Sequence, residues 1–289
     1  DNYHVQDLKK LIKAVDYISL HTYPMHETHY FPEYWGVFDG EESLSKLEKI
    51  DADTLITVSY KPSANPIKSK NTEKSIFEEV AKKYNLDFKV SDHDFIDFNF
   101  QRTLPHKFSQ YGPSLAVGDI NGDNLDDMFV AGSRGFEATW FIQSDDGSFE
   151  QKNVNYKKTE KLEEEDAGTL LFDADADGDL DLYIARGCGQ YPAGHEFYRD
   201  VLMINDGNGN FSEAQEALPN MTANSSAIKA ADFDRDGDLD LFIGSRVLPF
   251  SYPKSDRSFI LRNESSGNKA KFIDVTEDIS SELLHPGMI

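Results

Sequence analysis

The sequence has a single cysteine, Cys188, and lacks any long apolar run. One cysteine cannot form an intrachain disulfide, so disulfides are excluded as the stabilising framework. No stretch approaches the roughly 18 consecutive apolar residues that a membrane-spanning helix requires, so we expect no direct membrane insertion. The opening Asp1-Asn2 is unlike a signal peptide, and we expect the chain to be part of a longer polypeptide.

Basic residues are scarce beside acidic ones. The chain has 52 Asp and Glu against 29 Lys and Arg, and its formal net charge is -23. A chain this negative is repelled by phosphate groups, so we expect neither nucleic acid nor an anionic membrane surface as partner. Hydrophobic residues make up 39% of the sequence, which is enough for a core.

Three stretches of the sequence share one pattern, an acidic loop followed by an apolar strand. They read AVGDINGDNLDDMFVAG, LLFDADADGDLDLYIARG and AADFDRDGDLDLFIGSR. Their first aspartates, Asp119, Asp173 and Asp232, lie 54 and 59 residues apart, close to the length of a four-stranded propeller blade with its loops. The repeat therefore predicts a β-propeller-like segment.

A second hairpin ends each repeat. Its last strand begins at a phenylalanine, Phe149, Phe211 or Phe272, after a turn rich in glycine, asparagine or aspartate. The stretch around Phe77 is similar, and we expect it to be the tail strand of a preceding blade. The fold predicted for residues 75–289 is mainly β, a partial propeller of about three blades.

Oxygen-bearing side chains occupy alternate positions of each acidic loop. A tight turn around a hard cation directs every second side chain inward, and position 7 offers its backbone carbonyl, so that leucine is acceptable there. Position 6 requires left-handed backbone, which suits Asn124, Gly178 and Gly237. The predicted ligands are Asp119, Asn121, Asp123, Leu125 and Asp127 in the first loop, Asp173, Asp175, Asp177, Asp179 and Asp181 in the second, and Asp232, Asp234, Asp236, Asp238 and Asp240 in the third.

An EF-hand and a metal-free turn are the two alternatives to a β-loop-β calcium site. An EF-hand needs a glutamate at position 12 between two helices, but Val130, Ile184 and Ile243 stand there in apolar strands. Plain Asp-Gly turns without metal would leave four or five carboxylates within nine residues repelling one another. We therefore predict about three Ca²⁺ ions, favoured over Mg²⁺ because the ligand set is flexible, numerous and all oxygen.

These loops resemble the FG-GAP/VCBS repeat of integrin-type propellers and of large secreted bacterial proteins. The stretches LPHKFSQYGPSLAVGDINGDNLDD and ALPNMTANSSAIKAADFDRDGDLDLFIGSRVLP are similar to VCBS-repeat proteins that often carry an ASPIC/UnbV region. The resemblance covers about residues 75–289 and implies calcium binding, a propeller and an extracellular or cell-surface location in bacteria. It does not imply one defined activity.

Residues 1–60 read as a small α/β segment, and the polar stretch 61–74 reads as a linker. The sequence VDYISLHTYPMHETHYFPEYWGVFDG resembles part of a family 17 β-1,3-glucanase (β/α)₈ barrel, which implies a sugar cleft near His21, Tyr23 and Trp35. Packing residues are the alternative, and a zinc site at His21, His26 and His29 is a weaker one. That family's two glutamate motifs are absent, so catalytic glutamates would lie outside this chain.

Two loops that follow the acidic repeats, 186–200 and 246–257, carry aromatic residues. Loops at one end of a propeller commonly contact ligands, although packing between blades is the alternative. Cys188 and His195 also resemble a nucleophile pair, but a lone cysteine with a nearby histidine is more often incidental. The candidate ligand contacts are Tyr191, His195, Tyr198, Phe250 and Tyr252.

The leading hypothesis is a calcium-binding extracellular recognition or adhesion module for a glycan or a surface protein. The alternative is a fragment of a polysaccharide-degrading enzyme. Asn220, Asn224 and Asn263 begin glycosylation sequons, which often arise by chance.

Overall fold

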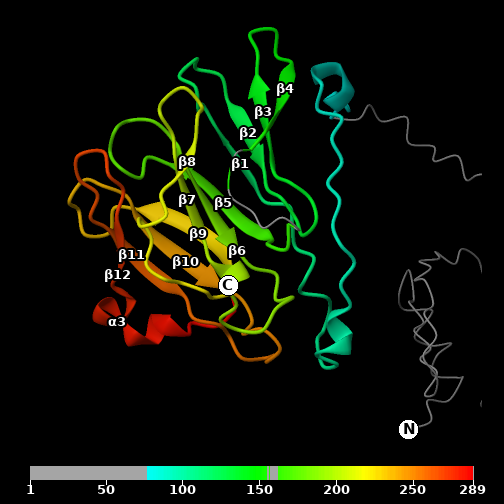
Figure 1. Ribbon diagram of the computed structural model, residues 1–289, viewed down its shortest axis with the longest axis vertical. Coiled ribbons are helices and arrows are strands. Elements are labelled where there is room, and N and C mark those ends of the chain that lie inside the picture. Colours follow the sequence, from blue (N-terminus) through cyan, green and yellow to red (C-terminus); the bar gives the residue numbers. More distant parts are fainter. Residues whose placement is uncertain (1–76, 155, 157–161, 289) are drawn as a thin grey trace, which may run out of the picture. The chain divides into compact units, whose positions relative to one another are not determined.

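The computed structural model describes residues 77–154, 156 and 162–288 (Figure 1). These residues belong to one compact unit, 75–289. The expectations for the α/β segment 1–60 and the linker 61–74, including the sugar cleft at His21, Tyr23 and Trp35, lie outside the described residues. None of the helices described is long and apolar enough to cross a membrane.

The described residues form three four-stranded antiparallel sheets, each a meander in chain order, which we call blades 1 to 3 (Figure 1). Blade 1 comprises β1 (Leu115–Gly118), β2 (Asp127–Val130), β3 (Thr139–Gln143) and β4 (Phe149–Asn153). Blade 2 comprises β5 (Asp166–Phe172), β6 (Asp181–Arg186), β7 (Val201–Ile204) and β8 (Ser212–Glu213). Blade 3 comprises β9 (Ser225–Ala231), β10 (Asp240–Ser245), β11 (Phe259–Asn263) and β12 (Phe272–Asp274). The predicted mainly β fold of about three blades is confirmed.

Short helices occupy the connections and the two ends of this unit. They are η1 (Ala81–Tyr84), η2 (Asp97–Asn99), η3 (Glu196–Tyr198), α3 (Thr276–Ile279) and η4 (Ser281–Leu284). The tail strand expected around Phe77 is wrong, because η1 begins four residues later and the Phe77 side chain is 86% exposed. The backbone N–H groups of Lys83 and Tyr84 donate to the carbonyl of Val80, so this segment closes a helical turn instead of pairing as a strand.

Blade 2 lies between the other two blades, which explains the composition of its second strand. All six residues of β6 are buried. Leu182 and Ile184 point toward blade 1, where they pack with Phe129 and Trp140. Because successive side chains of a strand point to opposite faces, the residues between them face blade 3. The near-continuous apolar run of β6 follows from burial on both faces.

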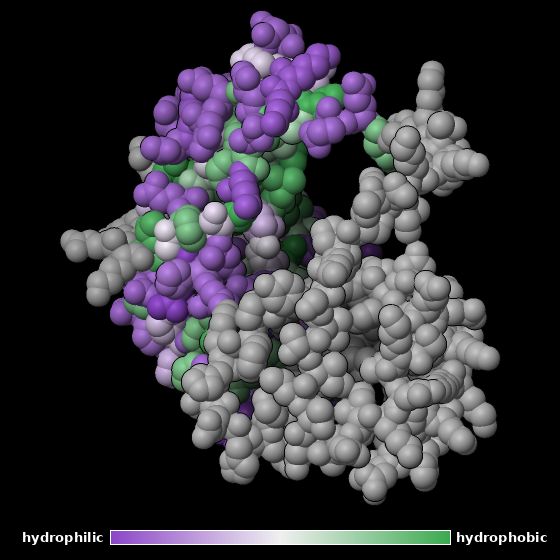
Figure 2. All heavy atoms as spheres, turned by 90° about the vertical axis from the view of Figure 1, so that its right-hand side faces the viewer, coloured by the Kyte–Doolittle hydropathy of each residue, from purple (hydrophilic) through white to green (hydrophobic). Residues whose placement is uncertain are grey.

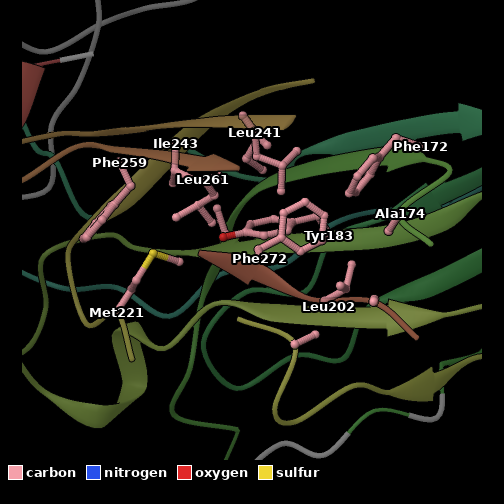
Figure 3. Close-up of a cluster of buried hydrophobic side chains, with 14 of the residues drawn as sticks. Phe172, Ala174, Tyr183, Leu202, Met221, Leu241, Ile243, Phe259, Leu261 and Phe272 are labelled. Atoms are coloured by element: carbon pink, nitrogen blue, oxygen red, sulfur yellow. The ribbon is translucent and has the colours of Figure 1, made fainter. Parts of the chain in front are cut away.

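The core between blades 2 and 3 is built around Tyr183 (Figure 3). Tyr183 pairs with Leu202 on β7, and both pack with Leu241 and Leu261 of blade 3. Phe172 and Phe272 meet edge to face in the same cluster, with ring centroids 6.2 Å apart. The first strands of adjacent blades, β5 with β9 and β1 with β5, supply most of the backbone contact between blades.

The two outer blades leave apolar side chains exposed. On β1, Leu115 is 56% and Val117 is 51% exposed, whereas the equivalent Leu171 of β5 packs against blade 1. Hydrophobic residues are visible between hydrophilic ones from the side shown in Figure 2. At the other end Phe233 is 43% exposed, although its equivalents Ile120 and Ala174 are buried.

The antiparallel meander separates the loops into two groups. The acidic loops join the first and second strands of each blade, and the turns between the third and fourth strands lie at the same end. The connections between the second and third strands lie at the opposite end, which we call the rim. The aromatic loops 186–200 and 246–257 therefore belong to the rim, remote from the acidic loops.

Candidate metal centre and aromatic rim

The three acidic loops, which we call metal loop 1 (119–127), metal loop 2 (173–181) and metal loop 3 (232–240), share one backbone conformation. Position 6 is left-handed in each, with φ of 66° at Asn124, 99° at Gly178 and 104° at Gly237. This agrees with the residue types that the sequence places there. The left-handed residues turn the chain sharply enough to direct the alternate side chains inward.

Position 4 of each loop is left-handed as well, which the sequence analysis missed. The φ angles are 79° at Gly122, 63° at Ala176 and 68° at Arg235. Only the first loop has a glycine there, so sequence alone gives no common signal. The non-glycine residues adopt a conformation that costs roughly 1 to 2 kcal/mol, which the rest of the loop must offset.

The aspartates at position 9, Asp127, Asp181 and Asp240, connect each loop to its own blade. In metal loop 2, Oδ2 of Asp181 accepts the backbone N–H of Ala174 at 2.8 Å and Oδ1 accepts that of Asn205 at 2.8 Å. Asp127 and Asp240 make the same two kinds of bond. These carboxylates are almost fully buried. Besides being predicted ligands, they fix the loop to the end of the third strand.

Metal loop 2 has carboxylate oxygens without a hydrogen-bond partner. Oδ1 of Asp173, Asp175 and Asp179 are buried and make no hydrogen bond to the described residues. Oxygens of Asp173, Asp175 and Asp177 lie within 4.8 Å of one another. Buried anionic oxygens without donors are strongly unfavourable unless a cation lies among them. The donor set of this loop fits a hard divalent cation.

Metal loop 3 has a similar arrangement. Oxygens of Asp232, Asp234 and Asp240 lie within 4.8 Å of one another, and Oδ1 of Asp238 is buried without a partner. Asp232 and Asp234 are exposed to solvent. This loop has the same chemistry as metal loop 2 but is more open.

In metal loop 1 the carboxylate oxygens accept hydrogen bonds from the loop's own backbone N–H groups. Asp119 accepts N–H groups from residues 121 to 124, the shortest at 2.8 Å from Gly122 and Asn124. Asp123 accepts the N–H of Leu125 at 2.8 Å. This loop has fewer carboxylates at its ligand positions, because position 3 is Asn121 and position 7 is Leu125. It has the weakest fit of the three to a cation.

Burial and neighbouring carboxylates shift the pKa values of several aspartates in the metal loops. Burial, and then the neighbouring Asp177, raises the pKa of Asp179 to about 6. Burial raises the pKa of Asp181 to about 7, against two backbone hydrogen bonds that lower it. Burial and Asp236 likewise raise the pKa of Asp238 to about 6. In Asp119, four backbone hydrogen bonds outweigh burial and hold the pKa below its usual value.

At the rim, the predicted contacts of the loop 186–200 pack on one another. Tyr191 stacks on His195 with ring centroids 4.8 Å apart, and the guanidinium of Arg134 lies 5.3 Å from the Tyr191 ring. Tyr198 is buried and its hydroxyl donates to the carbonyl of Tyr191 at 2.6 Å. Tyr198 therefore has a structural role and cannot reach a ligand.

The loop 246–257 packs against a segment that sequence reasoning missed. Phe250 stacks on Phe100 with centroids 5.1 Å apart, and the backbone N–H of Tyr252 donates to the side chain of Gln101 at 2.8 Å. Phe100 in turn stacks on Phe95 at 5.3 Å. Phe250 has φ of 60°, which is uncommon for a bulky residue.

Tyr111 extends this aromatic surface. It stacks on Phe108 at 5.9 Å, and the guanidinium of Arg246 lies 3.6 Å from its ring centroid. The sequence does contain a signal, the dense run of aromatics between residues 95 and 111. We call Phe95, Phe100, Phe108, Tyr111, Phe250 and Tyr252 together the aromatic rim.

Burial argues against a nucleophilic Cys188 and against two of the three sequons. Burial raises the pKa of the Cys188 thiol well above its usual range, which is the opposite of what a nucleophile needs. Of the three sequon asparagines, Asn224 and Asn263 are buried, so a glycan cannot be attached to them in the folded protein.

A comparison with known protein families agrees with the repeated blades. Residues 173–243, which run from metal loop 2 through metal loop 3, match the family model of the FG-GAP-like repeat. No similar sequence was found among curated proteins.

Two solved structures match part of the chain with low similarity. One is an Agrocybe aegerita lectin described as recognising non-reducing terminal N-acetylglucosamine, with 20% identity and a TM-score of 0.39 over 61% of this chain and 41% of that one. The other is a candidate exo-β-1,3-galactanase from Bifidobacterium bifidum S17, with 15% identity and a TM-score of 0.34 over 59% of this chain and 55% of that one. The chain thus spans about half the length of these structures or less, and the likeness is too low to support a functional argument. What the comparisons do identify is an FG-GAP-like repeat at residues 173–243.

Proposed function

We propose that this protein is a calcium-stabilised recognition module that acts outside the cell or at its surface. The observation that carries the calcium assignment is the set of buried, unpartnered carboxylate oxygens in metal loop 2, on Asp173, Asp175 and Asp179. Calcium prefers six to eight oxygen ligands in a flexible arrangement, and alternate aspartates with backbone carbonyls supply such a set. The metal serves a structural role, holding the first hairpin of each blade.

Calcium titration of the metal-free chain by calorimetry tests this assignment. Wild-type protein should bind about three Ca²⁺ ions, and the double substitution D175A/D177A should remove one site. Asp146 is a matched control, because it is an exposed aspartate in the β3–β4 turn that caps Ser148 and belongs to no metal loop. D146N should leave the stoichiometry unchanged. A wild-type chain that binds no calcium would refute the assignment.

The ligand surface of this module is the aromatic rim, and its ligand is a glycan. Phe100 is 60% exposed, so its ring is available to solvent although Phe95 and Phe250 hold it in place by stacking. Aromatic rings held rigid at a surface present flat apolar faces, which suit the apolar faces of sugar rings. A surface protein could use the same aromatic anchors and is the other outcome of the test.

A binding screen on immobilised glycans, with β-1,3-glucan included, tests the rim. F100A should abolish or strongly weaken binding, whereas F77A, which removes a ring that is 86% exposed on the segment before η1, should not. A parallel assay for released reducing sugar separates recognition from the enzyme alternative. Release of sugar would favour a polysaccharide-degrading enzyme, and retention of a protein partner without glycan would favour a surface-protein ligand.

A further inference from the structure

One asparagine side chain joins metal loop 1 to metal loop 2. Asn205 lies at the end of β7 in blade 2 and is 4% exposed. Its side-chain nitrogen donates to the carbonyl of Ile120 in metal loop 1 at 2.8 Å and to the carbonyl of Leu180 in metal loop 2 at 3.2 Å. An asparagine amide has two N–H groups, so it can serve both carbonyls at once.

The same arrangement recurs one blade further on. Asn263, at the end of β11, is 2% exposed. Its side-chain nitrogen donates to the carbonyl of Ala174 in metal loop 2 at 3.1 Å and to that of Leu239 in metal loop 3 at 3.2 Å. The two asparagines therefore connect the three loops in series, each across one interface between blades.

Both amides are held in place by their remaining atoms. The side-chain oxygen of Asn205 accepts N–H groups from Asp206 at 2.9 Å and Gly209 at 3.1 Å. Its backbone N–H donates to Asp181, the position 9 aspartate of metal loop 2. With both the nitrogen and the oxygen of the side chain engaged, the amide cannot turn away from one carbonyl without disturbing the other hydrogen bonds.

The four carbonyls lie next to predicted ligands. Ile120 stands between Asp119 and Asn121, and Leu180 stands between Asp179 and Asp181. A cation that orders one loop fixes the carbonyl in that loop, and this fixes the shared amide. The amide is then already placed for the neighbouring loop, which loses less conformational freedom when it binds its own ion.

We propose that Asn205 and Asn263 couple neighbouring metal loops, so that calcium at one loop raises the affinity of the next. The proposal rests on the proposed calcium sites. It assigns the asparagines a positioning role, since they act through the loop backbone and do not touch the ion.

Blade 1 contains a matched control. Gln143 ends β3 at the position equivalent to Asn205, and its backbone N–H makes the equivalent bond, to Asp127 at 2.8 Å. No blade precedes blade 1 in the described residues, so the Gln143 side chain has no earlier metal loop to join. Q143A should therefore leave the coupling intact.

The test is calorimetric calcium titration of the full chain in variants that keep two neighbouring loops. With metal loop 3 disabled by D232A/D234A, loops 1 and 2 should bind calcium with positive cooperativity. N205A should reduce the affinity of the second ion roughly five-fold, the effect of about one buried hydrogen bond, and abolish the cooperativity. N205S, which donates at most one hydrogen bond, should do the same if the alanine variant fails to fold.

A second measurement needs no asparagine substitution. Disabling metal loop 1 with D119A should weaken metal loop 2 more than metal loop 3, because the coupling runs between neighbours. Equal affinities in all of these chains, or the same loss in Q143A as in N205A, would overturn the coupling and leave the calcium sites standing. No calcium binding by wild type would refute the proposed function itself.

Discussion

The hydroxyl of Tyr183 donates a hydrogen bond to Oδ2 of Asp200 at 2.8 Å inside blade 2. The second carboxylate oxygen of Asp200 accepts the backbone N–H of Arg186 at 2.8 Å, so one buried side chain ties the rim end of β6 to the start of β7. Burial raises the pKa of Asp200 to about 7, although these hydrogen bonds and Arg186 lower it.

This raised pKa predicts a pH dependence of stability. The Asp200 carboxyl ionises near pH 4 in the unfolded chain and near pH 7 in the folded protein, so folding disfavours its charged form. The contribution of Asp200 to the free energy of unfolding should therefore fall as pH rises from about 4 to about 7 and stay constant above that. The loss should be at most about 4 kcal/mol.

Replacement of Asp200 by asparagine should remove this part of the pH dependence. Urea unfolding of D200N and wild type at pH 4 to 8, at one calcium concentration, isolates the effect because the loop aspartates contribute equally to both. D145N, at an exposed aspartate of the β3–β4 turn outside the metal loops, should follow the wild-type profile. Identical slopes for D200N and wild type would contradict the account of Asp200.

The interface between blades 1 and 2 should be sensitive to cavities. Ile184 is fully buried in β6 and packs in the cluster with Phe129 and Trp140. I184A should lower the free energy of unfolding by about 2 to 5 kcal/mol. L115A, on the exposed side of β1, should cost less than about 1 kcal/mol. Equal costs in chemical denaturation would mean that the blades do not pack as described.

The left-handed residues at position 4 of the metal loops predict stabilising substitutions. A176G and R235G relieve an unfavourable backbone conformation and should raise the free energy of unfolding by about 0.5 to 1 kcal/mol each. G122A, the reverse change in metal loop 1, should lower it by about 1 kcal/mol. Thermal unfolding in excess calcium measures all three, and destabilisation by both glycine variants would contradict the loop geometry.

Local patterns in the sequence were sufficient to predict the blades and their loops. The runs after each acidic loop contain β-branched and aromatic residues, and they form β2, β6 and β10 as expected. The left-handed position 6 was predictable because glycine and asparagine stand there. Position 4 was not, since Ala176 and Arg235 carry no such signal.

Contacts between distant segments could not be predicted in the same way. Phe100 and Phe250 lie 150 residues apart, and only the fold brings their rings together. The roles of Asn205 and Asn263 likewise depend on how adjacent blades align. The strand expected at Phe77 is wrong because the local pattern does not decide between strand and helix there, and the chain forms the short helix η1 four residues later.

The measurement that tests the central claim most directly is thermal unfolding of the chain in excess Ca²⁺, in Mg²⁺ and in chelator. A cation that binds only the folded state stabilises it by about 2.7 kcal/mol per site at one hundred times its dissociation constant. The account predicts a large increase in Tm with Ca²⁺ and little with Mg²⁺. Identical melting curves in all three conditions would show that the loops are turns without metal and would contradict the account.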